Sequence, residues 1–457
     1  MGETLFGTDG IRGTANKYPM TADLMLGLGR ALADWLDGEN QRKKVLVGKD
    51  TRISGYLLEY ALTSGLVSRG VDVLLVGPMP TPAIAHLTKS FAADAGVVIS
   101  ASHNPAEDNG VKIFDRNGLK LSAEEEAKIE GMIASQGKSE GSEGARSDPI
   151  TVSAMGKVRR IDDARGRYNE LLKHAIANLS LKGLKIALDC ANGAAYSIAP
   201  EIFTEFGAEV AVINNRPDGM NINDGAGALH PGKVSEIVRG HYADVGVSLD
   251  GDADRVIFVD ENGKTVDGDA ILYLVGCYLK EKGLLVKDTV VATVYSNSAL
   301  DKALQKKGIR VVRVACGDRN VLEMMDANGY VFGGEESGHL IFRDYATTGD
   351  GILAALQVIR IMKETGKRLS ELIASYTPAP QVVRSGRVAE KVPLEGLPGA
   401  RQEITSIEKK LGCDGGRVFV RYSGTEPKVR VLVEGQGPID EYADTILRMI
   451  QEETEGR

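Results

Sequence analysis

The stretch KVLVGKDTRISGYLLEYALTSGLVSRGVDVLLVG, residues 44–77, runs from one apolar strand through a helical segment to a second apolar strand. Its order of β-branched strand, polar loop, amphipathic helix, glycine and strand is typical of a βαβ unit. The same order returns in residues 184–213 and 289–314. A glycine stands where each helix should end, at Gly70, Gly207 and Gly308. We therefore expect three sheets that contain parallel strands and are flanked by helices.

A further strand with a polar loop follows each of these units. ADAGVVISAS (93–102) aligns without a gap with ADVGVSLDGD (243–252), and the third copy is GYVFGGEESG (329–338). Ligands of α/β proteins gather beyond the carboxyl ends of strands, so we expect the chemistry of the protein at these three loops. The alternative is three unrelated surface turns rich in glycine and acidic residues.

Two irregular stretches separate these units from their neighbours. Residues 135–148 are small or charged and almost free of large apolar side chains, which is typical of a linker. YTPAPQ (376–381) contains two prolines and precedes a strand, a polar turn and a strand in residues 416–435. The sequence predicts an α/β protein of four domains, in which three similar mixed-sheet α/β domains precede a smaller C-terminal α+β domain. The expected limits are 1–152, 153–254, 255–370 and 375–457.

Composition and charge restrict the class of protein. With 457 residues, 43% of them hydrophobic and 26% charged, the chain is long enough for about two to four globular domains. It has no apolar run of about 18 residues and no signal-peptide pattern, so we expect a cytoplasmic protein. The formal net charge of −8 argues against nucleic acid or an anionic membrane as the main partner, so an anionic substrate needs a local basic pocket. The four cysteines are widely spaced and are interpreted as reduced and structural: Cys190, Cys277, Cys316 and Cys413.

The loop DGDADR places Asp250, Asp252 and Asp254 at alternating positions directly after an apolar strand. Three carboxylates this close repel one another unless a cation lies among them, and all-oxygen ligation suits Mg²⁺. A solvated acidic turn and the Asp-x-Asp site of a haloacid-dehalogenase-type phosphatase are alternatives. A calcium EF-hand fits poorly because its loop requires a glutamate at the twelfth position.

The loop SASHNP offers Ser102 as a nucleophile or phosphate carrier, with His103 beside it and Lys112 ten residues further on. A serine triad is the rival interpretation, but the G-x-S-x-G pattern of a nucleophile elbow is missing around Ser102. A capping or turn role for the serine is the other alternative. The aligned aspartate loop favours the chemical role.

The loop GGEESGH contains Glu335, Glu336, Ser337 and His339 between flanking glycines. Carboxylate and hydroxyl groups in a row are good partners for sugar hydroxyls, which both donate and accept hydrogen bonds. An ordinary turn is the alternative.

The loop RYSGTEPKVR combines guanidinium groups, hydroxyls and an exposed glycine amide. A phosphate dianion binds several charge-assisted donors at once, so this pattern predicts a phosphate cradle, although the Walker spacing of a P-loop is absent. A plain hairpin turn is the alternative. The candidate residues are Arg421, Ser423, Gly424, Thr425 and Arg430.

Three further cations follow or precede expected strands. Arg12 lies in FGTDGIRG, and Lys49 and Arg52 lie in GKDTR. We expect all three to point toward a shared cleft, and surface salt bridges are the alternative.

Taken in order, FGTDGIRG, ISASHNP, DGDADR, GGEESGH and RYSGTEP resemble the five loops of the α-D-phosphohexomutase superfamily over essentially the whole chain. The stretches GKDTRISGY, PMPTPA, DCANGAAY, NIN and TTGDGI look most like the branch that acts on glucosamine phosphates. Two positions depart from that branch, Ala253 where a glycine is common and Asn320 where a tyrosine is more usual. Neither position touches the expected metal carboxylates.

The resemblance implies a four-domain enzyme in which Ser102 is a phosphoserine. It implies that Mg²⁺ is held by Asp250, Asp252 and Asp254 together with a phosphoryl oxygen on Ser102, with Arg255 near that phosphate. It implies sugar contacts at Glu335 and Ser337. The distal phosphate would be bound by Arg421, Ser423, Gly424, Thr425 and Arg430. Proton transfer or charge stabilisation would fall to Arg12, His103, Lys112 and His339.

The implied reaction interconverts glucosamine 6-phosphate and glucosamine 1-phosphate through glucosamine 1,6-bisphosphate, or with glucose 1,6-bisphosphate as activator. This reaction supplies the route to UDP-N-acetylglucosamine and the cell wall. The expected partner is a small phosphosugar, with no nucleic acid and no membrane, and a homodimer is an option. Alternatives within the superfamily prefer mannose or glucose phosphates. From other classes, a metal-dependent sugar phosphatase with Asp250 as nucleophile and a non-catalytic phosphosugar-binding protein stay open.

Overall fold

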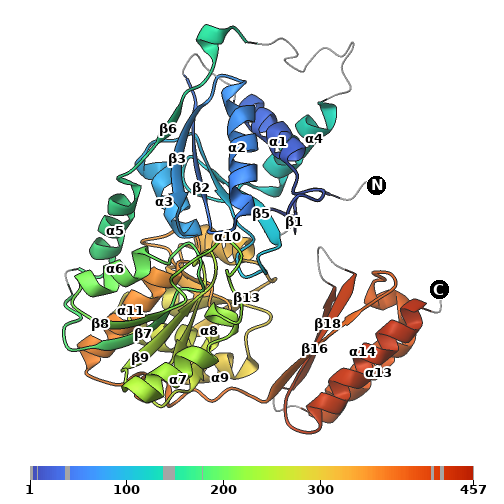
Figure 1. The fold of residues 1–457 in the computed structure, drawn as a ribbon. Helices are drawn as coiled ribbons and strands as arrows, with labels where there is room; N and C mark the ends of the chain where they lie inside the picture. The colour runs from blue at the N-terminus through green and yellow to red at the C-terminus, as the bar shows by residue number, and fades with distance from the viewer. Residues whose placement is uncertain are drawn as a thin grey trace.

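The computed structural model describes most of the chain in four domains (Figure 1). The described residues are 4–7, 9–36, 42–136, 150–177, 179–412, 416–422 and 427–455. Most of the expected linker at 135–148 lies outside them, as do Cys413, Ser423, Gly424 and Thr425. In the described part of the chain, Cys190, Cys277 and Cys316 are free thiols, as expected. No helix among the described residues is both long enough and apolar enough to cross a membrane.

The first domain is a six-stranded sheet with helices on both faces. Its strands lie in the order β1 (Ile11–Thr14), β5 (Asp108–Asp115), β4 (Ala95–Ile99), β2 (Lys44–Lys49), β3 (Asp72–Pro78) and β6 (Val158–Arg160). Its helices are α1 (Ala22–Trp35), α2 (Ser54–Val67), α3 (Thr81–Ser90) and α4 (Ala123–Ser135). Successive side chains of β2 point to opposite faces, so Val45 and Val47 pack with α1 and α2 while Leu46 packs with α3. Each face therefore has its own apolar core.

The second and third domains repeat this plan with shorter sheets. The second sheet has the order β11 (Thr265–Val266), β10 (Val256–Val259), β9 (Val245–Leu249), β7 (Lys185–Asp189) and β8 (Glu209–Ile213). The third has the order β13 (Arg310–Val314), β12 (Thr289–Thr293), β14 (Phe332–Gly334) and β15 (Leu340–Phe342). The surrounding helices are α5 (Ala164–Ala175), α6 (Ile198–Glu205), α7 (Gly232–His241), α8 (Gly268–Glu281), α9 (Ser298–Lys306), α10 (Asp318–Asn328), α11 (Gly351–Thr365) and α12 (Leu369–Ile373).

The threefold repeat predicted from the sequence is confirmed by the sheet topology. In each domain the first strand of the βαβ unit lies between its two parallel neighbours, β2 between β3 and β4, β7 between β8 and β9, and β12 between β13 and β14. An antiparallel strand then follows in all three domains. The three polar loops consequently start at the carboxyl ends of equivalent strands, β4, β9 and β14.

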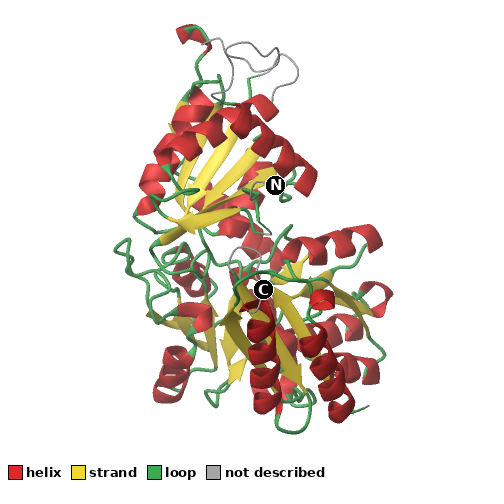
Figure 2. Ribbon diagram, turned by 90° about the vertical axis from the view of Figure 1, so that its right-hand side faces the viewer, coloured by secondary structure: helices red, strands yellow, loops and turns green. Residues whose placement is uncertain are grey.

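The fourth domain is a three-stranded antiparallel sheet with two helices packed on it (Figures 1 and 2). Its elements are β16 (Gln381–Arg387), α13 (Pro398–Leu411), β17 (Arg417–Tyr422), β18 (Lys428–Glu434) and α14 (Ile439–Glu455). The predicted strand, turn and strand in residues 416–435 correspond to β17 and β18, which pair antiparallel. Residues 374–380 connect this domain to the third domain and include the two expected prolines.

Two of the expected domain limits need correction. The first sheet continues past residue 152, because Val158 of β6 pairs in parallel with Val73 of β3. The second sheet continues past residue 254, because β10 and β11 complete it on the antiparallel side of β9. The limit at residue 254 was drawn at the end of the DGDADR loop and therefore cut off the strands that return to the same sheet.

Candidate active site

A large cleft lies where the three polar loops meet the fourth domain. Its volume is about 870 Å³, and all four domains contribute to its lining. The first domain contributes Arg12 and His103, and the second contributes Asp254 and Arg255. The third contributes Glu335, Glu336, Ser337 and His339, and the fourth contributes Arg421 and Arg430. The structure therefore brings together candidate residues that lie up to 418 positions apart in the sequence.

Ser102 lies directly beside this cleft, in the loop after β4, and its neighbour His103 is part of the lining. Its hydroxyl donates a hydrogen bond of 2.6 Å to Oδ2 of Asp250, and only 1% of the residue is exposed. Its backbone has a φ of +51°, a left-handed conformation that is uncommon for a residue other than glycine. Its amide donates to Oγ of Ser100 at 3.0 Å. Ser102 is thus held against the aspartate loop of the second domain.

Asp250, Asp252 and Asp254 form a buried carboxylate cluster, in which one oxygen from each lies within 4.8 Å of the other two. Burial raises the pKa of Asp250 well above its ordinary value, and the charges of Asp252 and Asp254 raise it further. Oδ1 of Asp252 and Oδ1 of Asp254 are buried without a hydrogen-bond partner among the described residues. An oxygen-lined site with unpartnered carboxylate oxygens fits a hard divalent cation such as Mg²⁺.

Lys112 supplies the one ammonium in direct contact with this cluster in the described part of the chain. Its Nζ lies 3.1 Å from Oδ2 of Asp252 and 3.2 Å from Oδ2 of Asp254. Burial alone would lower the pKa of Lys112, but the two carboxylates outweigh it and the net shift is upward. Lys112 offsets part of the negative charge of the cluster, and the guanidinium of Arg255, whose Nε lies 3.9 Å from Oδ1 of Asp254, offsets a further part.

His103 lies beside the hydroxyl of Ser102, and two arginines lie near His103. Nδ1 of His103 lies 3.4 Å from Oγ of Ser102 and 3.2 Å from a guanidinium nitrogen of Arg255. Burial, together with the charges of Arg255 and Arg12, lowers the pKa of His103 to about 3. Nε of Arg12 and Nε of Arg255 are buried and have no acceptor among the described residues. These unpartnered donors line a cleft that would accept an anion.

The loop after β14 presents carboxylate and hydroxyl groups to the same cleft. Glu335 accepts hydrogen bonds from the amide of Gly317 at 3.1 Å and from the hydroxyl of Ser337 at 3.3 Å. Nδ1 of His339 lies 3.7 Å from Oδ2 of Asp254, so this loop also reaches the aspartate cluster. Burial and the nearby Asp269 raise the pKa of Glu336 to about 8.

The fourth domain faces the cleft with two arginines on neighbouring strands. Arg421 of β17 and Arg430 of β18 are direct cross-strand partners. The guanidinium carbon of Arg421 lies 5.8 Å from the ring centroid of Tyr295 in the third domain. The loop between the two strands carries the three remaining candidates, which lie outside the described residues.

Four protein-family models match the chain in order. They are phosphoglucomutase/phosphomannomutase alpha/beta/alpha domain I at residues 3–140, domain II at 166–263, domain III at 267–379 and the C-terminal domain at 383–450. The chain belongs to the phosphoglucomutase/phosphomannomutase family. The predicted phosphohexomutase resemblance and four-domain α/β architecture are therefore confirmed, and members of this family are mutases, a class of isomerase.

Within the phosphoglucomutase/phosphomannomutase family, the chain is similar to relatives named phosphoglucosamine mutase. The phosphoglucosamine mutase of Anaeromyxobacter sp. (strain Fw109-5) is 52% identical over 453 residues, covering 98% of this chain and 96% of the relative. That of Citrifermentans bemidjiense is 51% identical over 457 residues, covering 99% and 98%. A solved phosphoglucomutase/phosphomannomutase family protein of Burkholderia thailandensis has the same fold, with a TM-score of 0.80 at 23% identity over 100% of this chain and 99% of that chain.

Sequence reasoning missed three acidic residues of this family member's cleft, Asp9, Asp108 and Asp318. Asp318 begins α10, and its Oδ2 lies 2.6 Å from Nζ of Lys120 and 3.5 Å from Nε2 of His339. Burial would raise the pKa of Asp318, but Lys120 and His339 lower it well below its ordinary value. The signal was present, because Asp318 follows β13 at the same edge of the third sheet.

The expectation that Lys49 and Arg52 point into the cleft is wrong. Nζ of Lys49 pairs with Oε2 of Glu59 at 2.6 Å, and both side chains are buried. Arg52 is also buried and donates hydrogen bonds to the backbone around Ser102. Neither is among the described residues that line the cleft. A cation after a strand can turn toward its own domain as readily as toward a ligand.

Proposed function

We propose that the chain is a phosphoglucosamine mutase that interconverts glucosamine 6-phosphate and glucosamine 1-phosphate. Ser102 carries the phosphoryl group, and glucosamine 1,6-bisphosphate is the intermediate. The observation that carries this proposal is the 2.6 Å hydrogen bond from Ser102 to Asp250, within a buried carboxylate cluster that reaches, through Asp254, a cleft lined with arginines. The choice of sugar rests on relatives named phosphoglucosamine mutase at 51–52% identity over nearly the full chain.

Asp250, Asp252 and Asp254 would hold Mg²⁺, with a phosphoryl oxygen on Ser102 completing the site. The ion would neutralise charge on the transferring phosphoryl group. The unpartnered oxygens of Asp252 and Asp254 are the donors that support this assignment. No other described residues cluster in this way.

Transfer of the phosphoryl group breaks its bond to Oγ of Ser102 and forms a bond to a free O1 or O6 of the sugar. The sugar hydroxyl gives up its proton to a ring nitrogen of His103, whose lowered pKa keeps the ring neutral. His339 is assigned to charge stabilisation, because its Nε2 already accepts the amide of Gly349 and its Nδ1 faces Asp254. The resulting bisphosphate reorients in the cleft, and its other phosphoryl group is transferred to Ser102. Phosphoryl transfer depends mainly on positioning and charge neutralisation, so a strongly activated nucleophile is not required.

The remaining cleft residues bind the parts of the sugar that do not react. We assign the sugar hydroxyls to Glu335 and Ser337, and charge neutralisation at the reacting phosphate to Arg12, Lys112 and Arg255. The distal phosphate is assigned to Arg421, Ser423, Gly424, Thr425 and Arg430. Because the bisphosphate must bind in both orientations, this distal cradle has to accept a phosphate from either end of the sugar.

The sugar preference is tested by adding glucosamine, mannose and glucose 6-phosphates separately, each with a trace of its 1,6-bisphosphate. Formation of the 1-phosphate is followed by ³¹P NMR. We expect the highest kcat/KM with glucosamine 6-phosphate, and a higher value with mannose 6-phosphate would overturn this choice. Net release of inorganic phosphate in place of isomerisation would identify a phosphatase. If the mutase activity is found, its product glucosamine 1-phosphate would be the precursor for UDP-N-acetylglucosamine and cell-wall synthesis.

A further inference from the structure

Two sequence stretches that the proposed mechanism does not use meet at the backbone of the Ser102 loop. They are GKDTR (48–52), at the end of β2, and NIN (221–223), in the second domain. Arg52 is one of the largest fully buried side chains of the described chain. A buried guanidinium carries five N–H donors in a fixed fork, and each of them needs an acceptor.

Arg52 finds an acceptor for all five donors. Nε donates to Oδ2 of Asp50 at 2.8 Å. One terminal nitrogen donates to the carbonyls of Ser102 at 3.0 Å and Asn104 at 2.8 Å. The other donates to the carbonyl of Asp108 at 3.0 Å and to that of Pro105. Four of the five acceptors are therefore backbone carbonyls of residues 102–108.

Asn223 holds two of the same carbonyls from the second domain. Its Nδ2 donates to the carbonyl of Ser102 at 2.8 Å and to that of Asn104 at 2.9 Å. Gly251 of the aspartate loop allows this approach, because a Cβ there would lie 2.5 Å from the carbonyl oxygen of Ser102 and 2.8 Å from Nδ2 of Asn223. Each of the two carbonyls thus accepts one donor from the first domain and one from the second.

Asp50 continues this network into the start of the loop. Its Oδ2 accepts a hydrogen bond of 2.6 Å from the hydroxyl of Ser100, and that hydroxyl in turn accepts the amide of Ser102 at 3.0 Å. Both backbone polar groups of Ser102 are therefore fixed by buried partners. A left-handed backbone at a serine is strained and persists only where the surroundings enforce it. Arg52, Asn223 and Asp50 are the surroundings that enforce it here.

We propose that Arg52 and Asn223 are positioning residues that aim the hydroxyl of Ser102 at Asp250 by holding the backbone of its loop from two domains. This inference rests on the proposed role of Ser102. Neither residue is among the described residues of the cleft lining, so neither is expected to contact the phosphosugar. Their effect should appear in the transfer step rather than in substrate binding.

The test compares Arg52→Lys and Asn223→Ala with the wild-type enzyme. Lysine keeps the charge but offers three donors in place of five, so at least two of the five acceptors lose the hydrogen bond that Arg52 donates. We expect kcat for isomerisation to fall by about 100-fold in Arg52→Lys, because a misplacement of about 1 Å at a reacting group has an effect of this size. We expect a fall of about 10-fold in Asn223→Ala, with KM for glucosamine 6-phosphate within about threefold of wild type in both. The rate at which each variant takes up one phosphoryl group from the bisphosphate, followed by intact mass, should fall in parallel.

Lys49→Met is the matched control for loss of a buried cation. Lys49 ends the same strand, pairs with Glu59 and lies over the ring of Tyr56, and no described residue of the 102–108 loop accepts a hydrogen bond from it. We expect this variant to lower thermal stability while kcat per folded molecule stays unchanged. A role for Arg52 and Asn223 in stability alone would give them the same outcome as the control.

Three results would overturn the proposal. They are wild-type kcat in folded Arg52→Lys and Asn223→Ala, a fall in kcat no larger than the unfolded fraction, and a rise in KM at constant kcat. Asn223 is half-exposed, so its variant decides the question alone if Arg52→Lys does not fold. An inactive wild-type enzyme would instead contradict the proposed function, which separates the two failures.

Discussion

The Ser102 loop and the fourth domain face the same cleft, but the structure holds them in different ways. The carbonyl of Ser102 accepts donors from Arg52 and Asn223, which belong to two domains, and its hydroxyl contacts Asp250. Described contacts between the fourth domain and the third gather at residues 294–298. There Arg417 donates to the carbonyl of Val294 at 2.7 Å, and Glu434 accepts the amide of Ser298 at 2.8 Å.

This difference matches what each region has to do in the proposed reaction. The atom that carries the phosphoryl group must be placed within a fraction of an ångström, which requires many directed hydrogen bonds. The phosphate cradle must bind either end of a bisphosphate that turns over. Attachment through one short contact region, set apart from the other domains in Figure 1, suits a domain that adjusts to its ligand.

The largest expected effect on turnover is at the Ser102 loop. Ser102→Ala removes the group that carries the phosphoryl unit, so turnover should fall by at least about 1,000-fold. Binding of glucosamine 6-phosphate, measured by calorimetry, should persist because the cleft cations are unchanged. Isomerisation at the wild-type rate in this variant would contradict both the mechanism and the role of the Ser102 loop in placing the phosphoryl group. Continued release of inorganic phosphate would point to Asp250 as the nucleophile.

Removal of the divalent cation should have the next largest effect. Chelation should lower kcat by about 100-fold or more, since charge at the transferring phosphate is then unbalanced. It should also lower the melting temperature, because a cation at about 100 times its Kd stabilises the folded state by about 2.7 kcal/mol.

The phosphorylated form should respond more strongly to chelation than the unmodified form. A phosphoserine at position 102 adds about −1.5 to −2 charges beside the three aspartates. Calorimetric melting of both forms, with and without chelator, measures this difference. Equal shifts in the two forms would show that the phosphoryl group and the cation do not share one site.

Much of the Ser102 loop and of the aspartate loop that it contacts could be predicted from the sequence, because the sequence patterns that indicate them are local. The strand before Ser102 and the strand before Asp250 align residue for residue, and β4 and β9 occupy equivalent positions in their sheets. Clustered carboxylates directly after such a strand indicate a metal site wherever the fold places the strand. The two loops were therefore predicted together without any knowledge of how the domains pack.

The sequence could not show in which direction a side chain points or which distant residues it contacts. GKDTR contains two cations three residues apart, and only the packing reveals that Lys49 turns to Glu59 while Arg52 turns to the Ser102 loop. The position of Asp318 after β13 could be read from the sequence, but its contact with His339 depends on the packing of the third sheet. The first-domain limit was missed because β6 is a three-residue, solvent-exposed strand without an apolar pattern.

A smaller effect is expected at the fourth domain. Arg421→Ala removes a cross-strand cation from the cradle, and a hydrogen bond to a charged group contributes about 1.5–3 kcal/mol, so KM should rise by about 10- to 100-fold. We expect kcat to fall less than KM rises, in contrast to Arg52→Lys. Steady-state kinetics with glucosamine 6-phosphate distinguish the two patterns.

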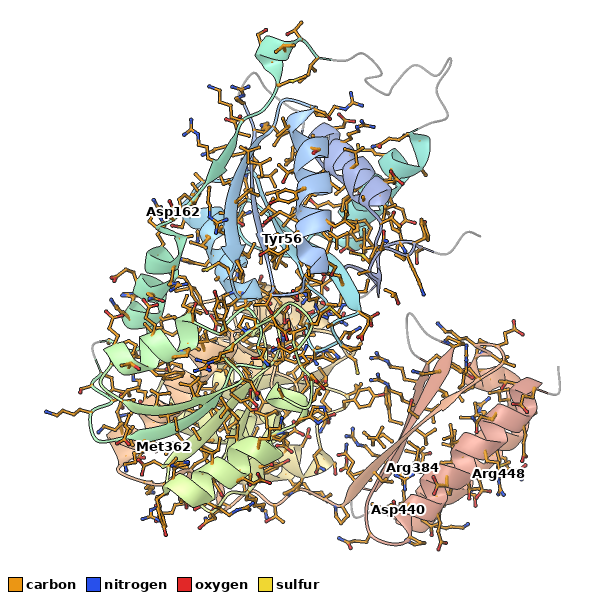
Figure 3. The ribbon with its side chains drawn as sticks, viewed as in Figure 1. Tyr56, Asp162, Met362, Arg384, Asp440 and Arg448 are labelled. Atoms are coloured by element: carbon orange, nitrogen blue, oxygen red, sulfur yellow. The ribbon has the colours of Figure 1, made fainter. Side chains whose placement is uncertain are left out.

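Arg384→Ala is the matched control in the same domain. Arg384 lies on β16 and pairs with Asp440 of α14 (Figure 3). It also pairs with Asp444 of the same helix. It is not among the described residues that line the cleft. Unchanged KM is expected here, and a rise equal to that of Arg421→Ala would mean that the fourth domain acts through its overall charge rather than through its cradle.

The smallest effect on turnover is expected at Asp350, which lies outside both regions. Its carboxylate caps α11 by accepting the amide of Leu353 at 2.9 Å, and it accepts the hydroxyl of Tyr168 at 2.8 Å. Burial raises its pKa from 3.8 to about 6 in the folded protein. The folded state therefore holds this proton more tightly than the unfolded state. The stability that the protonated carboxyl contributes is complete below about pH 4 and is lost as the pH rises through 6. The loss amounts to about 3 kcal/mol at most.

Asparagine is an equally good helix cap, so Asp350→Asn should leave kcat unchanged while its unfolding free energy no longer falls between pH 4 and pH 6. Urea unfolding at both pH values measures this difference. An equal fall in the variant and the wild type would assign the pH dependence to other buried carboxylates.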